Sequence, residues 1–172
     1  MSTAAVVAFA VVPLVLGGCG SGMGSGPSPS SGTASPESGS ANALAGMDPC
    51  RSFTADEAAQ LGTEGPGRAK ELAGSRTCRW QVPAGTLTVG FDDKRALSGL
   101  NFADFHVTDT DLAGRTAKLA EGDPGAGSCQ VAFEVADSSS ATVHAVASDM
   151  NNETACQLAQ QVAPMVEAKL PR

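Results

Sequence analysis

Residues 129–147 read CQVAFEVADSSSATVHAVA, and this stretch predicts a β-hairpin with one buried face. Apolar side chains recur at every second position from Cys129 to Val135 and again from Val143 to Ala147, which is the period of a half-buried strand. The polar run Asp137-Ser138-Ser139-Ser140 between them is typical of a turn. A hairpin of this kind needs a second layer of structure over its apolar face.

A second hairpin is expected upstream, between residues 76 and 91, with Pro83-Ala84-Gly85 as its turn. The side chains expected to face the core are Cys78, Trp80, Val82, Leu87, Val89 and Phe91. Residues 116–119 predict a further short strand. The mixed pattern of residues 95–105 fits either a short helix or an irregular segment.

Helices are expected at both ends of this strand-rich region. Thr54-Ala55-Asp56-Glu57 has the form of a capping box, and Gly62 ends the helix that it begins. A C-terminal helix should begin after Asn151 or Asn152, and Pro164 should kink or divide it. The predicted fold class is therefore α+β: an antiparallel sheet of two hairpins plus a short strand, with the N- and C-terminal helices on one face. The apolar stripe of the last helix is Ala155, Leu158, Ala159, Val162, Val166 and Leu170.

The N-terminal residues 1–18 predict a lipoprotein signal peptide. The apolar run from Val6 to Leu16 has the length of a secretory h-region and falls short of the about 20 residues of a membrane span. Small residues then precede Cys19, in the order Leu16-Gly17-Gly18-Cys19. We expect Cys19 to be lipidated, with acyl chains such as palmitate, and to hold the exported protein on the outer face of the cytoplasmic membrane. In the alternative, an ordinary signal peptide, Cys19 is incidental.

A flexible tether should connect this anchor to a single globular domain. Residues 20–46 are almost all Gly, Ser, Pro, Ala and Thr, so they cannot bury enough apolar area to fold. A coil of this length reaches about 30 Å. The expected organisation is a signal peptide over residues 1–18, lipidated Cys19 and tether over 19–47, and one domain over 48–172.

Four of the five cysteines remain once Cys19 is assigned to lipid. An even number in an exported domain predicts two disulfides, and three pairings are possible. We favour Cys50–Cys78 and Cys129–Cys156, because each of these pairs joins a helix start to a strand in the same half of the domain. A metal or redox site is the alternative, but the chain has no C-x-x-C and neither histidine lies near a cysteine in sequence.

Charge and motifs give little support to a specific chemistry. The net charge of −7 argues against nucleic acid and anionic lipid as partners. Only His106 and His144 could act as bases near neutral pH, and no G-x-S-x-G is present. Asp109-x-Asp111 could be half of a calcium site, but a solvated loop is the simpler interpretation. We predict no catalytic residue, cofactor or metal site, and we interpret the arginines around Cys78 as a solvated strand edge.

Several landmarks together resemble a known family. They are Asp48-Pro49-Cys50, Cys78-Arg79-Trp80, Gly114-Arg115-Thr116-Ala117, and Cys156-x-Leu-Ala with a terminal Leu-Pro. This set is similar to the actinobacterial lipoproteins catalogued as domain of unknown function 3558. The resemblance implies a lipid-anchored or secreted envelope protein of a high-GC Gram-positive bacterium. It implies no activity, and only the four cysteines transfer, as a structural framework.

These observations favour a non-catalytic binding or interaction module outside the cytoplasmic membrane. Its partner would be an envelope protein or a small ligand. Two alternatives stay open: an envelope enzyme acting on wall or peptide substrates, with His144 or His106 as base, and an accessory subunit of a membrane complex.

Overall fold

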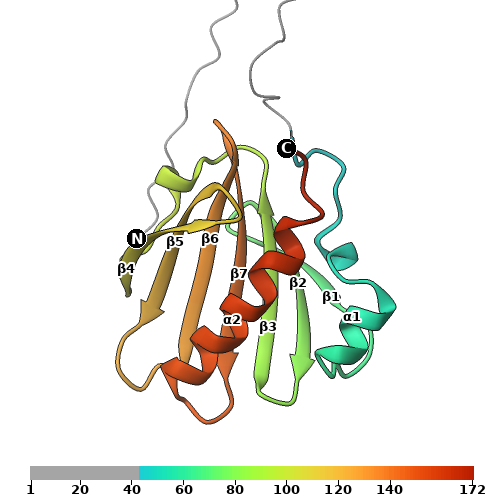
Figure 1. Cartoon of the computed structure of the whole chain (residues 1–172), viewed down its shortest axis with the longest axis vertical. Helices are drawn as coiled ribbons and strands as arrows, with labels where there is room; N and C mark the ends of the chain where they lie inside the picture. The colour runs from blue at the N-terminus through green and yellow to red at the C-terminus, as the bar shows by residue number, and fades with distance from the viewer. Residues whose placement is uncertain (1–42) are drawn as a thin grey trace, which may run out of the picture. The chain divides into compact units, whose positions relative to one another are not determined.

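The structure, a computed structural model, describes residues 43–172. The expected signal peptide, the lipidation site Cys19 and nearly all of the tether lie outside the described residues. A seven-stranded sheet and two α-helices make up the described chain (Figure 1). Its elements are η1 Pro49–Arg51, α1 Ala55–Gln60, β1 Arg68–Leu72, β2 Ser75–Val82, β3 Gly85–Asp92, η2 Leu97–Gly99, β4 Phe105–Leu112, β5 Arg115–Gly122, β6 Ser128–Ala136, β7 Ser139–Ala147 and α2 Asn152–Glu167.

The sheet is antiparallel throughout, with the strand order β1-β2-β3-β7-β6-β5-β4. The two predicted hairpins are β2–β3 and β6–β7, and the pairing of β3 with β7 joins them into one sheet. The predicted short strand over residues 116–119 is the centre of β5. The antiparallel architecture is therefore confirmed. The sheet has two strands more than the expected two hairpins plus one short strand.

The two strands that the sequence pattern missed, β1 and β4, are the edges of the sheet. All five residues of β1 are exposed, and β4 is exposed except at its two ends. An edge strand is stabilised by hydrogen bonds to one neighbour and needs no buried face, so its sequence carries no apolar alternation. Asp109 and Asp111 were expected in a solvated loop and lie in β4 instead, because this exposed strand has no apolar alternation by which it could be predicted.

One face of the sheet, which we call the helical face, carries the main core. Residues paired across an antiparallel ladder point to the same face, so Cys78, Val89, Val143 and Val131 form one row. The long helix α2 packs over β6 and β7, as Figure 1 shows, and η1 packs against β2 and β3. The largest buried side chains of this core are Phe91, Phe133, Leu87, Val89, Val143, Val162 and Val166.

The N-terminal helix α1 is present but contributes little to this layer. Thr54 and Glu57 form the predicted capping box, and no residue of α1 is buried. The cover over β2 and β3 comes from η1 instead, which corrects the expectation that the N-terminal helix lies on the sheet. An ion pair between Glu57 and Lys169, with 2.6 Å from Oε2 to Nζ, connects α1 to the end of α2.

Pro164 does not divide α2, contrary to the sequence-based expectation. The helix runs unbroken from Asn152 to Glu167. Pro164 lies on the exposed side of the helix, and the carbonyl that loses its helical hydrogen bond belongs to Gln160, which is also an exposed residue. The opposite side of α2 buries Ala159, Val162, Ala163 and Val166, and this packing keeps the helix continuous.

The connection from β3 to β4 passes from the middle of the sheet to its far edge. Asp92 fixes its start, because the carboxylate accepts hydrogen bonds from Ser75 Oγ at 2.9 Å and Arg95 Nε at 2.8 Å. The connection also contacts β6 and β7 through η2. Leu97 is buried outside the main core, as are Ala120 and Ala132, which the register places opposite α2. We call this second side of the sheet the crossover face.

The packed part of the chain begins before the expected boundary at Asp48. Leu44 is fully buried in the main core, and the Arg76 guanidinium donates hydrogen bonds to the carbonyl oxygens of Leu44 and Met47. The last residues assigned to the tether, from Leu44 onward, therefore pack with the domain.

Candidate functional site

The crossover face carries a polar row that crosses most of the sheet. The register pairs Arg68 with Arg79, Arg79 with Thr88, and Thr88 with His144. His144 is in turn paired with Gln130 on β6. Because all of these pairs share one face, their side chains lie on the side of the sheet that α2 leaves uncovered.

At the β1–β2 end of this face three cations lie together without acidic partners. The 11 lysines and arginines of the chain all fall within the described residues. Six of them have a nitrogen within 4.0 Å of a described carboxylate oxygen. The five without such a partner in residues 43–172 are Arg51, Arg68, Lys70, Arg79 and Lys94. Three of these five, Arg68, Lys70 and Arg79, share the crossover face, and we call them the basic strip.

The geometry of the basic strip places like charges side by side. Arg68 and Arg79 are direct cross-strand partners, a position in which like charges destabilise a sheet. Lys70 is two residues from Arg68 on the same face, and its carbonyl accepts a 2.7 Å hydrogen bond from Thr77 Oγ1. All three side chains belong to exposed residues.

Two shallow hollows meet at the Arg68–Arg79 pair. One measures about 250 Å³ and is also lined by Glu64, Gln81 and Thr86. The other measures about 230 Å³ and reaches past Lys70 toward Thr77 and Thr88. The two arginines therefore line both depressions of the surface.

His144 lies farther along the same row and is partly buried. Its Nε2 is 2.8 Å from Ser128 Oγ, and its ring meets the edge of Phe105 with 6.3 Å between centroids. Burial, and after it the positive charge of Arg79, lowers the pKa of His144 below its usual 6.5. The imidazole is therefore neutral at pH 7, and a hydroxyl is within its reach.

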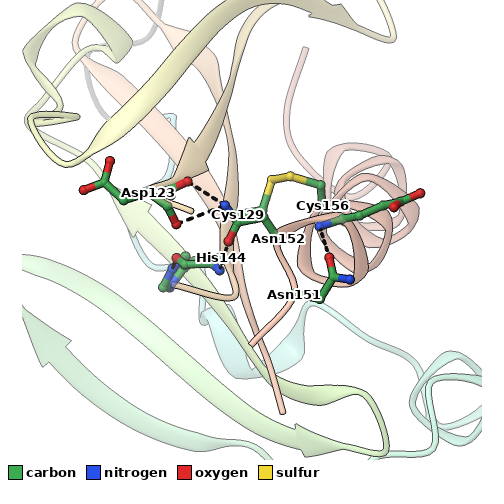
Figure 2. The surroundings of a disulfide bond; sticks show 9 residues. Asp123, Cys129, His144, Asn151, Asn152 and Cys156 are labelled. Carbon is green, nitrogen blue, oxygen red and sulfur yellow. Dashed lines mark hydrogen bonds between the residues drawn. A yellow bond between two sulfur atoms is a disulfide. The ribbon is translucent and has the colours of Figure 1, made fainter. Parts of the chain in front are cut away.

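The backbone around Ser128 is held by Asn152 at the start of α2. Asn152 Oδ1 accepts a hydrogen bond from the Ser128 amide at 3.1 Å. Its Nδ2 donates to the carbonyl oxygens of Gly122 at 2.6 Å and Asp123 at 3.1 Å. One side chain thus fixes both ends of the loop between β5 and β6, next to the Cys129–Cys156 disulfide that Figure 2 shows.

The other candidates from the sequence do not assemble into a site. His106 is 78% exposed, and its Nε2 is 3.9 Å from a carboxylate oxygen of Asp123, which is 75% exposed. Asp109 pairs with Lys118 on the neighbouring strand, and the Asp111 carboxylate accepts a hydrogen bond from the Gly114 amide. Within residues 43–172 no cluster of three or more His, Cys, Asp or Glu side chains could hold a metal ion.

Both expected disulfides are present, Cys50–Cys78 and Cys129–Cys156. The first joins η1 to β2, and the second joins α2 to β6. Trp80 is two residues beyond Cys78 on the same face and meets the edge of the Phe53 ring at 4.9 Å between centroids. The four cysteines of the domain therefore act as staples between the sheet and the segments on its helical face.

Sequence reasoning missed the basic strip because it missed β1. Arg79 alone has the appearance of a solvated strand position, and only the pairing of β1 with β2 brings Arg68 and Lys70 beside it. The only available signal for β1 was that Arg68, Lys70 and Leu72 stand at every second position. Because all five residues of the strand are exposed, no alternation of apolar and polar residues marked it as a strand.

None of the helices in residues 43–172 combines the length and the apolar character that crossing a bilayer requires. Comparison with curated proteins and with solved structures gives no match. Residues 14–169 match a family described as "Protein of unknown function (DUF3558)". Since this match covers most of the chain, the protein belongs to that family.

Proposed function

We propose that this chain is an exported, lipid-anchored lipoprotein of an actinobacterial cell envelope, held to the outer face of the cytoplasmic membrane through Cys19. The apolar run that ends at Cys19 and the tether composition support this location. In this setting the domain acts as a non-catalytic binding module. Its binding surface is the crossover face at the β1–β2 end.

One observation carries the binding role: three cations without acidic partners among residues 43–172 share an exposed face of an acidic protein. On the helical face α2 packs over β6 and β7 and η1 packs over β2 and β3, so the protein's own core covers most of that side and leaves a hollow of about 460 Å³ beside β1, lined by Met47, Ala69 and Glu71. The crossover face at β1–β2 has surface hollows and side chains that a ligand can contact. At this end of the sheet the side chains of Arg68, Lys70 and Arg79 are exposed and available to a ligand.

The lipid anchor is tested by metabolic labelling with a radioactive fatty acid in an actinobacterial host. The wild-type chain should incorporate label and sediment with membranes, and Cys19→Ala should do neither. Unlabelled wild-type protein in the culture medium would contradict the anchor.

The binding role is tested by photocrosslinking in intact cells. A photoreactive amino acid at Gln81, beside the basic strip, should give one recurrent adduct. The same residue at Gln157, on the exposed side of α2, is the matched control and should not. Equal adduct patterns from the two positions, or none from Gln81, would contradict a binding surface at this end of the sheet.

A second candidate, an envelope hydrolase, rests on the 2.8 Å contact between Ser128 Oγ and the neutral His144. Against it, no described carboxylate oxygen lies within 4.0 Å of the His144 nitrogens to orient the ring. The Ser128 amide, a candidate oxyanion donor, is bonded to Asn152. Labelling of Ser128 by a fluorophosphonate probe, lost in His144→Gln, would favour the hydrolase over the binding module.

A further inference from the structure

We propose that the basic strip is a binding site for a phosphate group, held between the guanidinium groups of Arg68 and Arg79 with Lys70 at its edge. This inference rests on the proposed binding role and names the chemistry of its ligand. No part of the sequence pattern or of the family description points to it.

The first argument is the uncompensated charge. Arg68 and Arg79 are direct cross-strand partners, so their repulsion works against the sheet. The chain contains 18 acidic residues, yet none of those described comes within 4.0 Å of either guanidinium or of the Lys70 ammonium. An anionic ligand that bridges the two arginines would remove the repulsion.

The second argument is geometric. A guanidinium presents a planar fork of N–H donors that matches two oxygens of a phosphate, and two such forks with an ammonium suit a dianion better than a single carboxylate. The Thr77 hydroxyl pins the Lys70 backbone to β2, so the strip sits on hydrogen-bonded sheet and not on a loop. The two hollows that the arginine pair lines leave room for the group that carries the phosphate.

The third argument concerns the surroundings of the strip. Glu64 also lines the 250 Å³ hollow, but its carboxylate lies more than 4.0 Å from the nitrogens of all three cations. It would repel the ligand slightly without neutralising the strip. The positive charge of Arg79 also contributes, after burial, to the lowered pKa of His144, which lies one strand beyond Thr88.

The test is a titration of the purified full chain with inorganic phosphate at constant ionic strength, followed by NMR of the arginine side-chain N–H groups. The Arg68 and Arg79 signals should shift saturably. Arg68→Gln and Arg79→Gln should each weaken phosphate affinity about tenfold or more. Arg51→Gln, which removes another exposed arginine that has no carboxylate oxygen within 4.0 Å among residues 43–172, should leave affinity unchanged, and Glu64→Gln should strengthen it.

A thermal readout separates binding from a structural role. Phosphate should raise the melting temperature of the wild-type chain, because a ligand of the native state stabilises it. Without phosphate, Arg68→Gln should melt no lower than wild type, since it relieves a like-charge pair. Lower melting of Arg68→Gln in phosphate-free buffer, non-saturable shifts, or equal losses in Arg51→Gln would overturn the site.

Two sources of phosphate can be told apart with vesicles. If the natural ligand is a lipid headgroup, vesicles of phosphatidylglycerol should sediment the Cys19→Ala chain, which lacks the proposed lipid, and adding Arg68→Gln/Arg79→Gln should reduce this binding relative to adding Arg51→Gln. If these variants sediment equally while inorganic phosphate still binds, the ligand is a soluble phosphate compound. A recurrent cross-link from Gln81 without any phosphate binding would leave the binding module in place and overturn only the phosphate site.

Discussion

Arg115 and Glu167 form the most buried ion pair among residues 43–172, with side-chain exposures of 10% and 3%. The Arg115 Nε lies 2.8 Å from Glu167 Oε1, and another nitrogen of the same guanidinium donates to the carbonyl of Pro171 at 2.6 Å. This one side chain connects β5 to the end of α2 and to the C-terminal residues.

Arg115→Ala should lower the free energy of unfolding by about 3 kcal/mol, because it leaves the buried Glu167 carboxylate with only the exposed Arg172 as a partner. Lys118 lies on the same strand as Arg115, and Lys118→Ala, which breaks the more exposed pair with Asp109 of β4, should cost less than about 1 kcal/mol. Urea denaturation of both variants measures the difference. Equal losses of unfolding free energy in the two variants would show that burial does not determine how much the Arg115–Glu167 ion pair stabilises the fold.

His144 should make stability depend on pH just below neutrality. Burial and the charge of Arg79 lower its pKa in the folded protein, so the unfolded chain takes up the proton first as the pH falls. The contribution is fully present above pH 6.5 and is lost as the pH falls from 6.5 through the lowered folded pKa. His144→Gln should flatten this slope in denaturation curves between pH 8 and 5. A variant that loses stability as steeply as wild type in this window would contradict the assignment.

At the scale of elements, the start of α2 and the β5–β6 loop behave as one unit. Asn151 caps the helix by accepting the Glu153 amide at 2.8 Å, while Asn152 binds the loop on both sides. The Cys129–Cys156 disulfide joins the same two elements beyond the loop. The Asn151 cap, the Asn152 hydrogen bonds and the disulfide together hold the glycine-rich β5–β6 loop in place, and this fixes the register of β6.

Asn152→Ala should cost about 2–3 kcal/mol, because it leaves the Ser128 amide and the Gly122 carbonyl without their partner. Asn152→Asp should cost less, since its carboxylate can still accept from the Ser128 amide. Hydrogen exchange should show faster opening of residues 122–128 in Asn152→Ala. Unchanged exchange there, with stability lost elsewhere, would mean that Asn152 acts only through the helix.

The edge elements show how much of the fold the sequence could predict. The β2–β3 and β6–β7 hairpins and the Thr54–Glu57 capping box were predicted, because alternation and caps are local patterns. The edge strands β1 and β4 were not, because their exposed residues carry no apolar period. Pro164 led to the opposite error: a break in the last helix was predicted, but α2 is continuous. The packing of its buried side outweighs the intrinsic tendency of proline to break a helix.

For the whole molecule, the disulfides connect the layers that the core holds together. The core relies largely on Val, Leu and Ala, with Phe91, Phe133 and Trp80 as its aromatic members. Cys50–Cys78 closes a loop with a sequence separation of 28 residues, and Cys129–Cys156 one of 27. Each cross-link restricts the unfolded chain and fixes a segment on the helical face.

Replacing either pair by alanine should lower the free energy of unfolding by about 3–4 kcal/mol, as the chain-entropy model gives for loops of this length. Urea denaturation of Cys50→Ala/Cys78→Ala and of Cys129→Ala/Cys156→Ala measures each contribution. Reductant should destabilise the wild-type chain and leave the quadruple variant unaffected. Unchanged stability of both double variants would show that the core alone holds the layers together.

The sequence by itself determined the central hairpins, the helix caps and the membership of the chain in its family, because these depend on local order and on residue type. Only the tertiary structure decided which strands pair. That pairing places β3 beside β7, adds β1 and β4 at the edges, and brings Arg68 and Lys70 next to Arg79. The physical reason is that an alternating apolar pattern arises only where one face of a strand is buried. Strand pairing depends on backbone hydrogen bonds, which form whatever the side chains are, so exposed edge strands show no such pattern. The candidate site was hidden from the sequence because it lies across such a pairing.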